Sequence, residues 1–136
     1  MSNPRAFTSF DFDHNEIHRM YFIGQSKNSR TPFNIEDWSS KKVLPEKEWE
    51  EFLEAKIKKC NILIVLVGRH MATATGVVKE IAFAKKNNVP VFGVYVDGAN
   101  SSSTLPIGLQ RNQTIAWAWD KIADAIDQCM KEGKNK

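Results

Sequence analysis

Glu80 is the residue in this sequence whose type and position point most directly to chemistry. It lies one turn into a predicted helix at 75–87, between two apolar segments, 62–67 and 91–96, that are predicted to be strands. In an open α/β sheet, helix starts that follow central strands border the crevice in which ligands bind. A carboxylate there stands beside a bound ligand. The same position also suits Glu for a structural reason, because a negative charge complements the helix dipole.

A second set of candidate residues ends the first predicted strand, residues 5–10. Ser9, Phe10 and Asp11 reach the same crevice as Glu80, and Phe12 follows them. The two phenylalanines are either core residues or contacts to a ligand ring, and the pattern leaves both open. Arg69 follows strand 62–67 at the crevice, where it either contacts a phosphate or is simply solvated.

Several functions of α/β folds are not supported by this sequence. The third strand ends in Val67-Gly68, where a response regulator needs a phosphoacceptor Asp. The sequence has no Walker A motif and no Gly-x-Gly-x-x-Gly, and the acidic Asp11-Phe12-Asp13 would repel a phosphate. His14 and His18 are four residues apart without a convincing third ligand. We therefore expect no metal and a solvated histidine face.

Alternating helix and strand patterns predict the scaffold. Strands that alternate with helices form a parallel sheet with right-handed crossovers, and apolar strands such as 62–67 belong at its centre. The sequence therefore predicts a three-layer, flavodoxin-like α/β fold with about five parallel strands in the order 2-1-3-4-5. This order brings the end of the first strand, the end of the third strand and the Glu80 helix together.

The remaining predictions concern individual elements. Asp13 and Glu16 predict a capping box for a first helix that ends near Phe22 and turns Ile17, Met20 and Tyr21 inward. The helix that begins at Pro45 should pack one apolar face on the sheet. Its apolar residues are Trp49, Phe52, Leu53, Ile57 and Cys60. The other expected segments are a loop at 24–30, a strand at 31–35, a polar loop at 36–44, a loop at 97–113, a strand at 114–117, a helix at 120–131 and a frayed tail at 131–136.

Composition indicates one domain spanning residues 1–136. The net charge of +3 is small and interspersed, so we expect no nucleic-acid partner. Cys60 and Cys129 lie far apart on apolar helix faces, which predicts buried free thiols in a reducing compartment. No apolar run is long enough to cross a membrane, and the N-terminus does not read as a signal peptide. We therefore expect a cytoplasmic protein.

The order of several short motifs resembles the bacterial TIR-like (Toll/interleukin-1 receptor-like) domain family, and is closest to the TIR-like component of Thoeris antiphage defence. Each motif alone is weak, but their order and spacing along nearly the whole chain are more specific. The motifs are Ala6-Phe-Thr-Ser-Phe-Asp-Phe12, Phe33-Asn-Ile-Glu-Asp-Trp-Ser39, Ile62–Gly68, Gly76-Val-Val-Lys-Glu-Ile-Ala-Phe-Ala84, Val89-Pro-Val-Phe-Gly-Val94 and Ala116-Trp-Ala-Trp119.

The resemblance implies an enzyme that cleaves NAD at the nicotinamide–ribose bond and releases an ADP-ribose-type signal, with NAD as substrate and no resident cofactor. Glu80 matches the family's catalytic Glu, which stabilises an oxocarbenium-like cation. The substrate-binding residues would then be Ser9, Phe10, Asp11, Phe12, Trp38, Ser39 and Arg69. The resemblance also implies self-association through the loop at 36–44, which carries Trp38, and a separate effector protein that reads the product.

One departure from the family concerns the shape of the nicotinamide pocket. Many TIR enzymes carry Trp four residues before the catalytic Glu, whereas this chain has Gly76 there. Two other functions therefore stay open at this point. One is a non-catalytic TIR-like interaction module, and the other is a nucleoside ribosyl-transferring enzyme, which also places a Glu beside a ribose in a similar fold.

Overall fold

The structure is a computed structural model that describes residues 4–28, 33–39, 45–71 and 74–136. Its centre is a five-stranded parallel sheet in the order β2-β1-β3-β4-β5, which confirms the predicted topology. The strands are β1 (Arg5–Ser9), β2 (Asn34–Trp38), β3 (Ile62–Val67), β4 (Val91–Tyr95) and β5 (Thr114–Ile115). All six residues of β3 are buried, as expected for a central strand covered on both faces.

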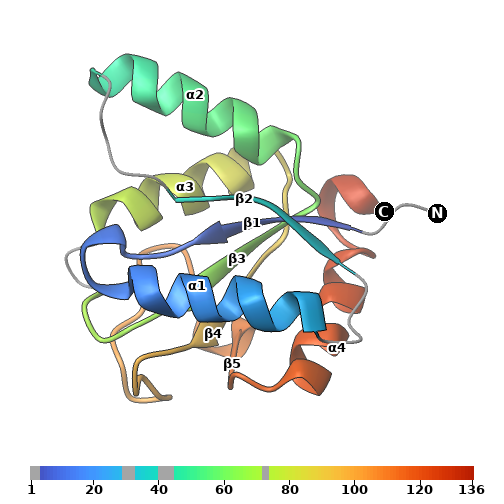
Figure 1. Ribbon diagram of the computed structural model, residues 1–136. Helices are drawn as coiled ribbons and strands as arrows, with labels where there is room; N and C mark the ends of the chain where they lie inside the picture. The colour runs from blue at the N-terminus through green and yellow to red at the C-terminus, as the bar shows by residue number, and fades with distance from the viewer. Residues whose placement is uncertain (1–3, 29–32, 40–44, 72–73) are drawn as a thin grey trace.

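Helices cover both faces of the sheet and complete three layers (Figure 1). They are α1 (Phe12–Asn28), α2 (Glu46–Lys58), α3 (Thr75–Lys86) and α4 (Trp119–Cys129). Helices α2 and α3 pack with one set of sheet side chains into one apolar cluster. Helices α1 and α4 pack with the opposite set into the other. Alternate residues of β3 divide between the two clusters, because successive side chains of a strand point to opposite faces.

Helix α1 differs from the sequence prediction in its start, its length and its inward face. Asp11 precedes it as the capping residue, and its carboxylate Oδ1 accepts a hydrogen bond from the backbone N–H of Asp13 at 3.2 Å. The helix continues into the predicted loop as far as Asn28, and residues 29–30 of that loop lie outside the described residues. The inward residues include the buried Asn15 and Phe22. The three residues that were expected to face the core are instead 53–58% exposed: Ile17, Met20 and Tyr21.

Other boundaries move by a few residues. Strand β2 runs through Trp38, so the predicted loop at 36–44 begins later, and its residues 40–44 lie outside the described residues, as do 31–32 of the predicted second strand. Phe52 on α2 is 52% exposed, so it does not join the buried face formed by Trp49, Leu53 and Ile57. The predicted strand at 114–117 is shorter and ends at Ile115.

The C-terminal segment, predicted to fray, forms specific hydrogen bonds with the start of β3 and the end of α4. Residues Gly133–Asn135 form a 3-10 turn against the start of β3. The Asn135 amide donates to the carbonyl oxygens of Asn61 and Cys129 at 2.8 and 3.1 Å, and its Oδ1 accepts from the Asn61 amide at 3.0 Å. Lys134 Nζ donates to the Lys58 carbonyl oxygen at 2.6 Å. Side-chain amides that satisfy buried carbonyls thus anchor a tail whose composition alone reads as polar and loose.

Both cysteines are free and buried, as predicted. Burial raises the pKa of the Cys129 thiol to about 12, with a smaller contribution from Glu132, so this thiol stays protonated at neutral pH. Among the residues that the structure describes, no helix has the length and apolar character needed to span a bilayer.

Candidate functional site

Glu80 is a buried carboxylate on the first turns of α3, with only 1% of its surface exposed. Two serine hydroxyls donate to its Oε1 atom, Ser9 Oγ at 2.7 Å and Ser39 Oγ at 2.5 Å. Hydroxyl-to-carboxylate hydrogen bonds of this length are the strong, charge-assisted kind. They join α3 to the ends of β1 and β2, so the predicted meeting of Glu80 with the first strand is confirmed.

The hydrogen bond from Ser39 has a defined direction. The backbone N–H of Phe10 donates to Ser39 Oγ at 3.0 Å, which leaves the Ser39 hydroxyl proton to be donated to Glu80. The chain from Phe10 through Ser39 therefore fixes one oxygen of the carboxylate from the backbone of β1. Ser39 was predicted on a polar loop, and its placement beside Glu80 depends on the pairing of β1 with β2.

A cavity of about 360 Å³ opens at Glu80, in the lower part of the range for small-molecule sites. Residues from the ends of β1 and β2, from α2 and from the starts of α1 and α3 line it. They are Phe10, Asp11, Phe12, Asp13, Ser39, Glu46, Trp49, Ala74, Thr75, Gly76, Val77, Lys79 and Glu80. Among the described residues, its ionisable lining comprises four carboxylates and one ammonium, which favour a cationic over an anionic ligand group.

The strand-end residues have divided roles. Phe10 lines the cavity but is only 2% exposed and belongs to the apolar cluster under α1, so it is a core residue that also forms part of the wall. Its ring lies 5.8 Å from that of Phe12, which is half-buried on the same wall. Ser9 is fully buried and does not itself line the cavity; it positions Glu80.

Asp11 combines three roles, because it caps α1, lines the cavity and pairs with a histidine. Its Oδ2 lies 2.6 Å from His14 Nδ1, and the His14 ring stacks on His70 with centroids 3.9 Å apart. The predicted solvated histidine face is therefore only partly correct. His18 also has an acidic partner, Asp97 Oδ1, at 3.7 Å.

Arg69, predicted to contact the substrate, does not line the cavity. It is 65% exposed and its Nη2 lies 3.1 Å from Asp97 Oδ1. Burial by itself would raise the pKa of Asp97, but the hydrogen bond and charge of Arg69, aided by Asn15 and His18, bring it below its usual value. The structure therefore places Arg69 in a salt bridge at the end of β3 and not on the cavity wall. The Trp38 side chain lies outside the described residues, and its backbone ends β2.

Gly68, at the end of β3, lies in close contact with Asn15 of α1. A Cβ atom at Gly68 would overlap the buried Asn15 side-chain amide, so the glycine leaves the space that this amide occupies at the end of β3. The Asn15 backbone departs from helical angles at this point (φ −122°, ψ 19°), and its Nδ2 donates to Asp97 Oδ2 at 3.3 Å. The start of α1 is thereby fixed beside the cavity.

Sequence reasoning missed the wall of the cavity that α2 provides. Trp49 was predicted as a core residue and is buried, but it also lines the cavity. A Cβ atom at Gly76 would lie 3.9 Å from Trp49 Cη2, so the indole covers the helix face one turn before Glu80. Gly76 was the signal in the sequence that could have identified this wall. A glycine on the face of α3 one turn before Glu80 leaves space that a side chain from another element can fill.

Among the described residues, no group of three or more His, Cys, Asp or Glu side chains is arranged to hold a metal ion. The site is thus built from a fixed carboxylate, an acidic cavity and two aromatic walls.

These features define a parallel α/β domain with a buried carboxylate at the carboxyl ends of its strands. The chain belongs to the family described as Thoeris protein ThsB, TIR-like domain, whose profile matches residues 7–101. The resemblance seen in the sequence motifs is thereby confirmed, and the matched region includes Glu80 and both of its serine partners. A search of curated proteins finds no match.

Proposed function

We propose that this protein cleaves NAD at the bond between nicotinamide and ribose. The observation that carries the proposal is the buried Glu80 carboxylate, which lines the cavity while Ser9 and Ser39 fix one of its oxygens. Its family membership adds a role in antiphage defence together with other components.

The chemistry proposed for Glu80 follows from charge. When the C1′–N bond breaks, its electron pair leaves with the pyridinium nitrogen, and neutral nicotinamide departs without needing a proton. The positive charge passes to the ribosyl group as an oxocarbenium-like cation. A carboxylate held in a water-poor site stabilises this cation more strongly than water does. Water, or a hydroxyl of the same ADP-ribosyl group, then forms the new bond at C1′ and releases its proton to solvent.

The lining of the cavity supports the same orientation of the substrate. Asp11, Asp13, Glu46 and Glu80 surround it with negative charge, which attracts the cationic nicotinamide end of NAD and repels the pyrophosphate. The proposal therefore places nicotinamide and its ribose in the cavity, against Phe10 and Phe12, and the pyrophosphate outside it.

Incubation of purified protein with NAD and, separately, with deoxynucleosides tests the reaction, with free base followed by chromatography. Nicotinamide release that is lost in Glu80→Gln supports the proposal, and release of a nucleobase from deoxynucleosides supports ribosyl transfer instead. Because such enzymes respond to a trigger, the same assay is run on lysates of phage-infected cells that express each variant. The absence of NAD loss in both settings refutes the proposal.

A second candidate function is that of a non-catalytic interaction module. It is favoured by three exposed apolar side chains on α1, Ile17, Met20 and Tyr21. In that case Glu80→Gln leaves phage protection intact, whereas charged substitutions on this face of α1 abolish it. The pair of variants therefore separates the two candidates in a single protection assay.

The proposal also includes partners, namely a second copy of the chain and an effector that reads the product, all in the cytoplasm. The expected interface is the segment 36–44, which includes Trp38 at the end of β2. Trp38→Ala should then abolish any rise of specific activity with protein concentration while leaving the melting temperature within about 2 °C of the wild type, a shift well under 1 kcal/mol for a domain of this size. Activity that is flat with concentration in the triggered wild type contradicts this part.

A further inference from the structure

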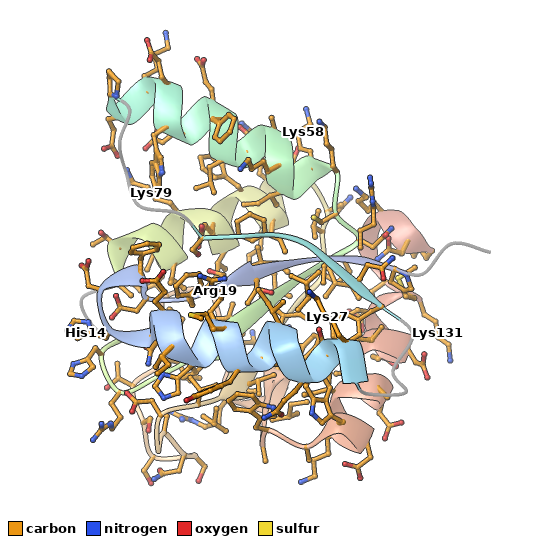
Figure 2. All side chains as sticks on the ribbon, viewed as in Figure 1. His14, Arg19, Lys27, Lys58, Lys79 and Lys131 are labelled. Carbon is orange, nitrogen blue, oxygen red and sulfur yellow. The ribbon has the colours of Figure 1, made fainter. Side chains whose placement is uncertain are left out.

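Lys79 is the one cationic side chain among the described residues that line the cavity. It directly precedes Glu80 on α3, yet its ammonium reaches across to α2, as Figure 2 shows. Lys79 Nζ forms ion pairs with Glu46 and with Glu50, the latter at 2.7 Å. It also lies 5.6 Å from the centre of the Trp49 ring, within the range of a cation–π interaction.

The surroundings of the Lys79 ammonium are also suited to bind an organic cation. Carboxylates and the face of an indole together attract a positive charge whose hydration is incomplete. Gly76, one turn before Glu80, places no side chain against the indole edge, because a Cβ atom there would already lie 3.9 Å from Trp49 Cη2. The Lys79 ammonium therefore lies close to the Trp49 ring and to the carboxylates of Glu46 and Glu50, at the cavity that Glu80 also lines.

We propose that Lys79 is a tethered competitor, which occupies in the empty protein the place of the positively charged ring of the substrate. This inference rests on the proposed function for the identity of that ring. A cationic pyridinium binds only when the ammonium leaves Trp49 and Glu50. This competition weakens the binding of the substrate to the wild-type protein. A neutral ring of the same shape gains nothing from the carboxylates and does not compete for them.

A different role for Lys79 would be to clamp α2 onto α3, and the chain offers a matched control for it. Lys86 lies two turns further along α3 and contacts Glu54 of α2 at 3.2 Å. Lys86 does not line the cavity. Loss of Lys79 removes two ion pairs between these helices and loss of Lys86 removes one, but only loss of Lys79 removes a cation from the cavity.

The test is a binding titration by ligand-observed NMR with two small probes, the N-methylnicotinamide cation and neutral nicotinamide. Four proteins are compared: the wild type, Lys79→Gln, Lys79→Arg and Lys86→Gln. We expect Lys79→Gln to bind the cation about two- to tenfold more tightly, the size of effect that one exposed cation–π or ion-pair competitor produces. Lys79→Arg and Lys86→Gln should bind it like the wild type, and nicotinamide should bind all four alike.

Each other outcome overturns the inference. Weaker or unchanged binding of the cation by Lys79→Gln means that Lys79 is not a competitor. An equal gain in affinity for nicotinamide means that the substitution only enlarged the cavity. An equal gain in affinity for the cation in Lys86→Gln means that the effect comes from a weaker contact between α2 and α3. Failure of the cation to bind any variant means that the cavity does not accept it. NAD turnover is scored separately, so the expected binding pattern without NAD cleavage refutes the proposed function alone.

Discussion

Glu80→Gln is the perturbation that bears most directly on the proposed reaction. The amide keeps the shape of the side chain and an oxygen that accepts from Ser9 and Ser39, but it removes the negative charge. A unit charge about 4 Å from the ribosyl cation, at an effective dielectric constant of about 20, contributes roughly 4 kcal/mol. Loss of this term predicts a fall in kcat/KM of about 10²- to 10³-fold, part of it in KM because the carboxylate also attracts the cationic nicotinamide ring.

The same substitution should leave the fold intact. Glu80 is 1% exposed, and burying a neutral amide is less costly than burying a carboxylate. The free energy of unfolding should therefore be equal to that of the wild type or slightly higher. Nicotinamide release is measured by chromatography and unfolding by circular dichroism in urea. Wild-type turnover in a folded Glu80→Gln protein would refute the assignment, and strong destabilisation would show that the carboxylate is chiefly structural.

Three further perturbations follow from the same geometry. Phe10→Ala should lower the free energy of unfolding by about 3–5 kcal/mol, because Phe10 is a core residue as well as a wall of the cavity; urea melts with an unchanged KM would confine it to the core. Ser39→Ala removes a hydrogen bond to Glu80 and leaves the Phe10 N–H without its acceptor. The kcat should therefore fall about tenfold and the free energy of unfolding by about 1–3 kcal/mol. A wild-type kcat would show that Ser9 alone orients the carboxylate. Asp97→Asn should destabilise the protein at neutral pH, because the ionised Asp97 stabilises the fold at pH values above its ordinary pKa of 3.8. The difference in the free energy of unfolding from the wild type should disappear as pH falls through the lower pKa of the folded state. A difference that is constant with pH would contradict the salt bridge to Arg69.

The sequence alone determined the layers and the order of the strands. Strand 62–67 is apolar on both faces, and only a central parallel strand under two helix layers buries such a segment completely. Once β3 and the alternating helices are assigned, the position of Glu80 at the carboxyl end of the sheet follows. The TIR-like motifs were equally visible, because they lie along β1, β3, α3 and β4.

The tertiary structure decided which face of each helix is buried and which side chains complete the site. Helix α1 buries Asn15 and Phe22 and exposes Ile17, and the buried Asn15 amide occupies the space beside Gly68. Trp49 reaches Gly76 only because α2 packs on α3, a contact between segments distant in sequence. Local patterns report how a segment folds, whereas the walls of a cavity are formed by side chains that meet only after the elements have packed.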